Sequence, residues 1–492
     1  MKTFTRRRLA RLALGGGAVV VAGGAALTLS ARPAAPPPDI QPRSRQFPPG
    51  FKWGVATSAF QTEGALDVDG RGPSIWDIFS RDGAHISDHS TAAVATDSYH
   101  RYGEDVGLIA EAGLKAYRFS IAWPRVQPAG AGAANDPGLD FYSRLIDAQL
   151  AAGIEPYATL FHWDLPQPLQ DQGGWLNRDT AARFADYAGL VVHRLGDRLK
   201  NFITLNEAAV HTIVGHVLGT QAPGFTDAAN IGPVTHHQNL AQGLAIQALR
   251  AARSDLVIGA TLALMPVRPS GPPWAFWNRL VSNRFGDLWN GAYLDPLLKG
   301  SYPETSLSFI EKSLKDGDLK ITRQPIDFMG VNYYSPAYIG FDLASDAHIA
   351  PGDPPAGVEL DAFARQVDPS GLSEILGWLR KDYGNPRVII TENGCSDPIS
   401  ETTPAIQDDG FRIRYLRRHL EAVRDAMEAG SPIDGYFIWS IIDNWEWDSG
   451  FTSKFGLVSQ AGPGGARVPK ASYAWFKALA ASGLLPEAGA GT

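Results

Sequence analysis

The chain has 492 residues, of which 44% are hydrophobic and 19% are charged, an ordinary balance for a protein that buries a large core. Its formal net charge is −7, so the sequence offers no basic surface of the kind that nucleic-acid binding requires. The single cysteine, Cys395, excludes an intramolecular disulfide. With no His or second Cys near it in the sequence, it is interpreted as a small buried apolar residue.

The N-terminus is predicted to be a processing segment that lies outside the fold. Residues 1–31 begin with a basic head, Arg6-Arg7-Arg8, and continue as an apolar run to Leu29. The stretch "TRRRLA" resembles the twin-arginine signal, which exports folded proteins across a bacterial inner membrane. Residues 32–46 are rich in proline and are predicted to be a linker. A cleaved signal would yield a secreted protein. Because no clean A-x-A cleavage site is visible, the alternative is that the segment stays uncut and anchors the protein in the membrane.

From Phe51 onward, short apolar runs alternate with longer amphipathic stretches. The amphipathic stretches repeat apolar residues at three- and four-residue steps, as in "DTAARFADYAGLVVHRLGD", which predicts helices. Eight runs are predicted to be strands: "FKWGVATSAF", "LKAYRFSIAW", "IEPYATLFHW", "NFITLNEA", "VIGATLALMP", "IDFMGVNYY", "RVIITENG" and "IDGYFIWSIIDN".

Continuous hydrophobicity within these runs favours parallel strands that are covered by helices. Eight strand-plus-helix units without a break predict a (β/α)8 TIM barrel that forms one catalytic domain over residues 47–485. The alternative is an open doubly wound sheet, which would want a glycine-rich phosphate motif after its first strand. The stretch "GALDVDGRG" lacks that spacing.

Two of the predicted strands end on a glutamate. Glu207 follows "FITLN" at the end of the fourth strand, and Glu392 lies at the end of "VIITE" in the seventh. In a barrel these strand ends form the floor of the active site, so the two carboxylates are expected to face each other across its mouth. Other polar and aromatic residues lie at or just past strand ends: Gln61, His162, Asn206, Tyr334, Trp439 and Glu446.

Facing carboxylates have three uses. A metal site would need further ligands, but His162 and Asp164 are not joined by a His-rich or acidic cluster, so none is expected. A structural ion pair is the second use, because Arg118 on the second strand could neutralise either glutamate.

The third use of facing carboxylates is cleavage of a glycosidic bond, in which one carboxylic acid protonates the leaving oxygen and the other carboxylate attacks the anomeric carbon. Asn206 then suits a bond to a sugar hydroxyl, and Arg118 and Tyr334 could hold Glu392 ionised.

Ten stretches in the right order give a family resemblance. They include "FKWGVATSAFQTEGA", "AYRFSIAWPRV", "FHWDLPQPL", "ITLNE", "DFMGVNYYSP", "VIITENG" and "WSIIDNWEW", and together they resemble glycoside hydrolase family 1, the β-glucosidase family, from about residue 47 to residue 479. The resemblance implies a (β/α)8 fold and retaining hydrolysis of β-glycosides, most simply β-D-glucosides, through a covalent glycosyl-enzyme and without a cofactor.

The resemblance also implies site residues. Glu392 matches the nucleophile, and Glu207 matches the general acid and base. The implied sugar contacts are Gln61, His162, Asn206, Glu446 and Trp447, with Trp439 as a stacking platform and Trp163, Asn332, Tyr334 and Arg118 in support.

Three stretches depart from the family's usual pattern, on the side that the family uses for the leaving group. Where the family usually has "NEP", this chain has Asn206-Glu207-Ala208, followed by Ala209. The usual "HAPG" begins here with Gln221 in place of the histidine, and Arg365 stands where a Trp is usual. The implied partner is a small-molecule or oligosaccharide β-glycoside. The substitutions are expected either to reshape the leaving-group pocket and make it less aromatic, or to be neutral changes at a tolerant rim. A transglycosylase that uses the same carboxylates, or a non-catalytic sugar-binding barrel, remains an alternative, and the sequence leaves a homo-oligomer open.

Overall fold

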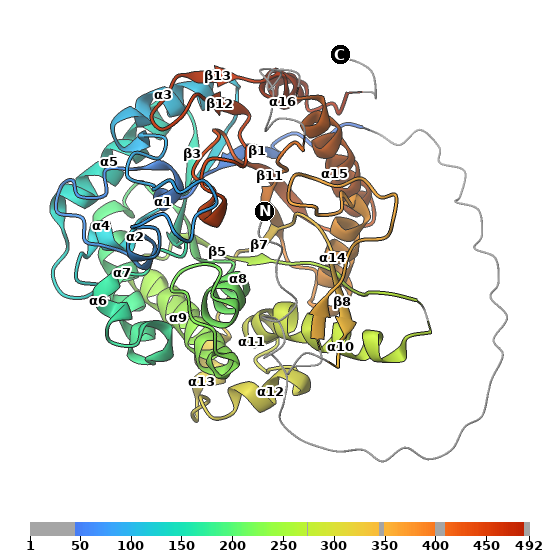
Figure 1. Cartoon of the computed structure of the whole chain (residues 1–492). Coiled ribbons are helices and arrows are strands. Elements are labelled where there is room, and N and C mark those ends of the chain that lie inside the picture. Colours follow the sequence, from blue (N-terminus) through green and yellow to red (C-terminus); the bar gives the residue numbers. More distant parts are fainter. Residues whose placement is uncertain (1–44, 273, 344–348, 399–408, 487–492) are drawn as a thin grey trace, which may run out of the picture.

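A closed barrel of parallel strands forms the centre of the molecule (Figure 1). The computed structural model describes residues 45–486 apart from 273, 344–348 and 399–408, so the predicted export signal and most of the linker lie outside it. The barrel strands are β1 (Lys52–Ala56), β2 (Ala116–Ser120), β3 (Glu155–Phe161), β4 (Asn201–Asn206), β5 (Val257–Ala263), β7 (Phe328–Asn332), β10 (Val388–Asn393) and β11 (Ile433–Trp439). Each lies within one of the eight predicted runs, so the predicted (β/α)8 fold is confirmed.

The strands follow chain order around the barrel, and β11 closes it by pairing in parallel with β1. Side chains on a strand alternate between its two faces, and in the barrel these faces point inward and outward. One layer of the interior is apolar and takes one residue from each of six strands: Ala116, Tyr157, Ile203, Phe328, Ile389 and Phe437. Two residues further along, Arg118, Thr159 and Thr391 bring polar groups inside, toward the carboxyl ends of the strands. The barrel therefore becomes polar towards one end.

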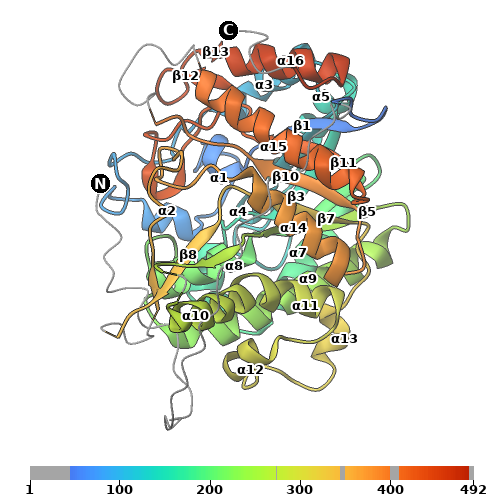
Figure 2. The ribbon, with the colours of Figure 1, turned by 90° about the vertical axis from the view of Figure 1, so that its right-hand side faces the viewer.

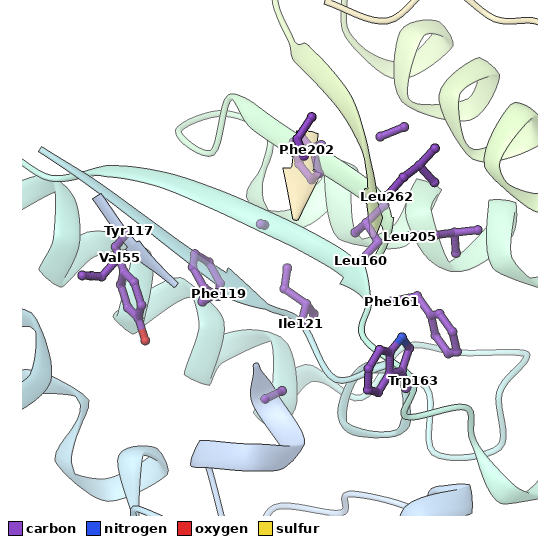
Figure 3. Close-up of a cluster of buried hydrophobic side chains, with 14 of the residues drawn as sticks. Val55, Tyr117, Phe119, Ile121, Leu160, Phe161, Trp163, Phe202, Leu205 and Leu262 are labelled. Atoms are coloured by element: carbon purple, nitrogen blue, oxygen red, sulfur yellow. The ribbon is translucent and has the colours of Figure 1, made fainter. Parts of the chain in front are cut away.

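The outward faces of the strands carry the main hydrophobic core. Phe119 on β2, Leu160 on β3 and Leu262 on β5 belong to one buried cluster, part of which is drawn in Figure 3. Helices cover this face, and the longer ones are α3 (Ser98–Glu111), α5 (Asp136–Ala151), α7 (Asp179–Leu195), α9 (Ile231–Ala252), α14 (Pro369–Asp382), α15 (Gly410–Glu428) and α16 (Ala471–Ser482). Within the described ranges, none of the helices is both long and apolar enough to cross a membrane.

The segments that follow the carboxyl ends of the strands hold most of the short elements, and together they build what we call the carboxyl-end face. They comprise α1 (Ala59–Thr62), α2 (Ile75–Phe79), α4 (Trp123–Val126), α6 (Gln167–Gln170), α8 (Ala208–Val210), a π-helix (His211–Leu218), α10 (Phe276–Gly286) and a short helix at Trp447–Ser449. A small sheet on this face has the order β6 (Val267–Pro269), β8 (Ala337–Phe341), β9 (Ile349–Pro351), and β12 (Val458–Gln460) pairs with β13 (Arg467–Pro469). Between β5 and β7 lie α11 (Ala292–Leu298), α12 (Glu304–Ile310) and α13 (Asp318–Thr322).

Candidate active site

The two glutamates lie at the carboxyl ends of β10 and β4, which β7 and β5 separate in the barrel. Glu392 is the penultimate residue of β10, and Glu207 directly follows the last residue of β4. Glu207 has a φ of 48°, a left-handed conformation that is uncommon for a glutamate and that ends the strand there. Both side chains are buried, with residue exposures of 3% for Glu392 and 6% for Glu207. Buried carboxylates need partners, and each has its own.

Glu392 has a cation on one oxygen and a hydroxyl on the other. Arg118 Nη1 forms an ion pair with Glu392 Oε1, and Tyr334 donates its hydroxyl hydrogen to Oε2 over 2.7 Å. Arg118 is fully buried and is oriented by a bond from its Nε to Thr159 Oγ1 at 3.0 Å. Charge-assisted bonds of this kind stabilise the carboxylate form. Arg118 therefore pairs with Glu392, the glutamate that the glycosidase interpretation of the sequence gave it, and not with Glu207.

Glu207 has an amide partner and no cation in hydrogen-bond contact among the described residues. Asn332 Nδ2 donates to Glu207 Oε1 at 2.7 Å, and Thr391 holds Asn332 by donating to its Oδ1 at 2.7 Å. Burial raises the pKa of Glu207 to about 8, and the charge of Glu392 adds to the effect. The bond from Asn332 and the charge of Arg118 offset only part of the increase. Glu207 is accordingly protonated at neutral pH beside an ion-paired Glu392.

Asn206 connects these groups. Its Oδ1 accepts from Arg118 Nη2 at 2.7 Å and from Asn332 Nδ2 at 3.1 Å, and its backbone oxygen accepts from Trp163 Nε1 at 2.9 Å. Its Nδ2 lies 3.0 Å from His162 Nε2. Asn206 was expected to bind a sugar hydroxyl, which stays a prediction, and the structure shows that it fixes the relative positions of Arg118 and Asn332.

His162 offers a hydrogen-bond donor to the site. Burial, with the charge of Arg118, holds the pKa of His162 well below its usual value, so the ring is neutral. Because an amide nitrogen donates, the bond from Asn206 makes Nε2 the acceptor and places the ring hydrogen on Nδ1. Nδ1 is buried and has no hydrogen-bond partner among the described residues.

Gln61 and Glu446 form a second polar group. Gln61 Nε2 donates to Glu446 Oε2 at 3.0 Å and to Asn444 Oδ1 at 3.1 Å, while Ser58 donates to Gln61 Oε1 at 2.6 Å. Burial raises the pKa of Glu446 to about 8, and the charge of Glu392 adds to the increase. The charge of Arg365 and a hydrogen bond from Trp439 lower the pKa and offset part of the increase. Gln61 and Glu446 are therefore held in fixed relative positions by hydrogen bonds within the protein.

Aromatic rings form a wall beside these polar groups. The ring of His162 stacks at 20° on Trp439, with centroids 5.7 Å apart, and at 20° on Trp447, with centroids 6.0 Å apart. Trp163 lies against Trp447 with centroids 4.8 Å apart. Flat apolar faces and hydrogen-bonding side chains therefore lie next to each other at this end of the barrel.

Arg365 lies on the chain between β9 and α14, next to the ring of Tyr334. Its guanidinium pairs with Asp361 at 2.6 Å and lies 5.1 Å from the centre of the Tyr334 ring. It also lies 4.7 Å from the Phe363 ring. Gln221, another departure from the family pattern, donates to Asp448 Oδ1 at 3.0 Å, next to Trp447.

The sequence predictions missed two residues of this arrangement. Thr391 precedes Glu392 and orients Asn332, and Asn444 holds Gln61. The signal for Thr391 was its place two residues after Ile389, since a polar residue at that spacing enters the barrel interior. Cys395 is buried as expected, and burial raises the pKa of its thiol well above the usual value. No cluster of three or more His, Cys, Asp or Glu suited to a metal ion occurs in the described part of the chain.

Comparisons with known proteins identify the family of this chain. Residues 43–483 match the model of the family described as Glycosyl hydrolase family 1. Beta-glucosidase A of Acetivibrio thermocellus is 40% identical over 442 residues, which are 88% of this chain and 97% of the relative. A bifunctional beta-D-glucosidase/beta-D-fucosidase of Bifidobacterium breve is 41% identical over 461 residues, again 88% and 97%. A solved Thermotoga maritima beta-glucosidase in complex with deoxynojirimycin superposes with a TM-score of 0.85 at 36% identity, over 90% of this chain and all of that one.

Proposed function

The chain belongs to glycosyl hydrolase family 1, and from this we propose that it is a retaining β-glycosidase in which Glu392 is the nucleophile and Glu207 the general acid and base. The observation that carries the assignment is the difference between the two carboxyls. Glu392 has a cation and a hydroxyl bonded to it, whereas Glu207 is buried with a pKa raised to about 8. Pairs of carboxyls with such different surroundings divide into a charged group and a proton donor.

The first step uses both groups at once. Glu207 donates its proton to the glycosidic oxygen while a Glu392 oxygen attacks the anomeric carbon, so that the bond to the leaving group breaks as a glycosyl ester forms. Retaining enzymes hold the two carboxyls about 5–5.5 Å apart, which leaves no room for a water molecule between nucleophile and sugar. The leaving group departs with the proton of Glu207.

The second step reverses the role of Glu207. Once Glu392 is an ester, its negative charge is gone, and one of the causes that raise the pKa of Glu207 is removed. Glu207 can then take a proton from the incoming water, whose oxygen attacks the anomeric carbon and releases Glu392. Asn332 remains bonded to Glu207 Oε1 in position to hold the carboxylate at this stage.

The surrounding residues are assigned to the sugar that is transferred. Gln61 and Glu446 would bind adjacent hydroxyls, and His162 would donate from Nδ1, the nitrogen that has no protein partner among the described residues. Trp439 and Trp447 would contact the apolar face of the ring, with Trp163 behind them. We assign β-D-glucosides as the substrate class because the relatives are named as beta-glucosidases.

The N-terminal segment supports a proposal about location. The twin-arginine-like head and the apolar run of residues 1–31 would export the folded barrel, with residues 32–46 as a linker. Replacing Arg6, Arg7 and Arg8 by lysine is expected to leave the protein in the cytoplasmic fraction of a bacterial host. Export that is unchanged in this variant would overturn the proposal.

A panel of aryl β-glycosides tests the activity itself. The gluco, galacto and fuco series are compared by kcat/KM, and NMR follows the anomer that is released first. The β-anomer first, with the gluco series hydrolysed fastest, is expected. If the α-anomer appears first, retention is wrong; if disaccharides accumulate instead of free sugar, the enzyme is a transglycosylase.

A further inference from the structure

Three of the four most exposed large apolar side chains of the described residues lie within four residues of sequence. Trp274, Phe276 and Trp277 have exposures of 83%, 65% and 55%, and with Leu280, which is 41% exposed, they lie just before and at the start of α10; we call these four the α10 patch. Leu343, which is 77% exposed, lies two residues beyond Phe341, whose ring centre is 5.9 Å from that of Trp277. Soluble proteins rarely expose contiguous apolar surface of this kind without a partner for it.

The patch is held firmly by the other face of its helix. Val281 and Phe285 of α10, with Leu288 just after the helix, are buried and cluster with Ile339 and Ile349 of the small sheet. Asn278 donates to the backbone oxygen of Ser270 and accepts from the Phe341 amide at 2.8 Å. The exposed aromatic side chains therefore belong to an ordered helix that already buries an apolar face of its own.

The segment that carries the patch is basic, although acidic residues flank it. Residues 274–286 contain Arg279 and Arg284 and no Asp or Glu, whereas Asp287 follows them directly and Asp342 precedes Leu343. Both arginines are exposed, and in the part of the chain that the structure describes neither forms an ion pair with a carboxylate. Arg284 lies four residues after Leu280 and seven after Trp277, which places it on the same side of α10.

The geometry of the rings disfavours a saccharide as the partner. A flat platform for several sugars in a row is favoured by coplanar rings, but Phe276 and Trp277 meet edge to face at 67°. Leucine adds apolar bulk without a stacking face, and the amide of Asn278, which follows Trp277, is bonded within the protein. Tryptophan, phenylalanine and leucine beside unpaired arginines are instead the composition of helices that lie in the interface of an anionic bilayer.

We propose that the α10 patch docks the protein on the surface of an anionic lipid bilayer. Trp274, Phe276, Trp277 and Leu280 enter the boundary between headgroups and acyl chains, and Arg279 and Arg284 pair with headgroup phosphates. This docking is independent of the glycosidase chemistry.

The docking surface belongs to the carboxyl-end face. The chain reaches α10 from the carboxyl end of β5, and β8 follows that of β7. Figure 2 shows β8 and α10 towards the same side as α2. A docked enzyme would therefore hold the side of the barrel that carries Glu207 and Glu392 near the lipid surface.

Hydrogen–deuterium exchange of the full chain tests the docking, with vesicles of phosphatidylglycerol or of phosphatidylcholine alone. The phosphatidylglycerol vesicles are expected to slow exchange severalfold in residues 274–286, and phosphatidylcholine vesicles much less. Trp274→Ser with Leu280→Ser should abolish the protection, and each of Arg279→Gln and Arg284→Gln should weaken vesicle binding about fivefold. Leu150→Ser is the matched control, because Leu150 on α5 is also 41% exposed.

Every variant keeps residues 1–44, so that the N-terminal segment contributes equally to vesicle binding. Hydrolysis of a small soluble β-glucoside should be unchanged in all of them, which shows that the barrel is folded. Unprotected residues 274–286, or equal protection in the double variant, would overturn the proposal. Protection of residues 274–286 by a soluble β-glucan would make the patch a saccharide platform. Protection that grows with protein concentration in the absence of lipid would make it a contact between copies of the chain. Either result would overturn the proposed docking on lipid.

Discussion

Glu392 raises the pKa of Glu207, although the two residues lie on strands that two others separate in the barrel. The larger cause of the shift is the burial of Glu207, and the charge of Glu392 adds to it. This relationship links the protonation of the acid to the charge of the nucleophile, and it makes the pH dependence of the reaction informative.

The rate should fall at alkaline pH. Protonated Glu207 is the active form, and its proton is lost as the pH rises through its pKa of about 8, so kcat/KM for a poor leaving group should decline above that pH. Glu446 has a pKa near the same value, so an activated leaving group serves as the control. The decline in kcat/KM at alkaline pH should be weaker for the activated substrate, because its leaving group needs no proton. A decline that is equally steep for both substrates would assign it to Glu446.

Removing the acid should have an effect that depends on the leaving group. Glu207→Ala is expected to lower kcat/KM about 10²–10⁴-fold for an alkyl or unactivated aryl β-glucoside, because nothing protonates the departing oxygen. For a dinitrophenyl glucoside, formation of the glycosyl ester should be nearly normal in single-turnover kinetics. An equal loss with both substrates contradicts the role of Glu207.

Tyr334→Phe should slow the reaction without changing the fold. The variant loses the bond from the hydroxyl to Glu392 Oε2, and a hydrogen bond to a charged group is worth about 1.5–3 kcal/mol, so kcat should fall about tenfold to a hundredfold. Tyr333→Phe is the matched control, because the Tyr333 hydroxyl donates to the backbone oxygen of Asp368. That variant should lose stability in thermal unfolding but keep its kcat. If both variants behave alike, Tyr334 has only a structural role.

Arg365→Trp should change the preference for leaving groups. Arg365 is paired with Asp361 and lies over Tyr334, where a Trp would present a flat apolar face instead. We expect kcat/KM to rise for aromatic aglycones relative to alkyl ones, measured over a series with one glucosyl group. Arg365→Lys keeps the charge and is expected to leave the ranking unchanged. Kinetics that are unaltered across the series in the Trp variant would show that the position is a neutral part of the rim.

Much of the fold was predictable because the eight barrel strands are continuous apolar runs that end in polar residues. The positions of Glu207 and Glu392 followed from the same pattern. The strands β6, β8 and β9 were not predicted, because strands of three to five residues inside long loops carry no period of their own. The hydrogen bonds of the Asn206 side chain could not be predicted, because a sequence does not say which way an amide points.

The identity of the residue that carries the glycosyl ester tests the assignment most directly. A 2-deoxy-2-fluoro β-glucoside with an activated leaving group should slow the second step and let the ester accumulate, after which peptic digestion and mass spectrometry locate the added sugar. We predict a single labelled peptide, with the sugar on Glu392. A sugar found on Glu207 or Glu446, or hydrolysis in which no ester can be trapped, would contradict the proposed roles.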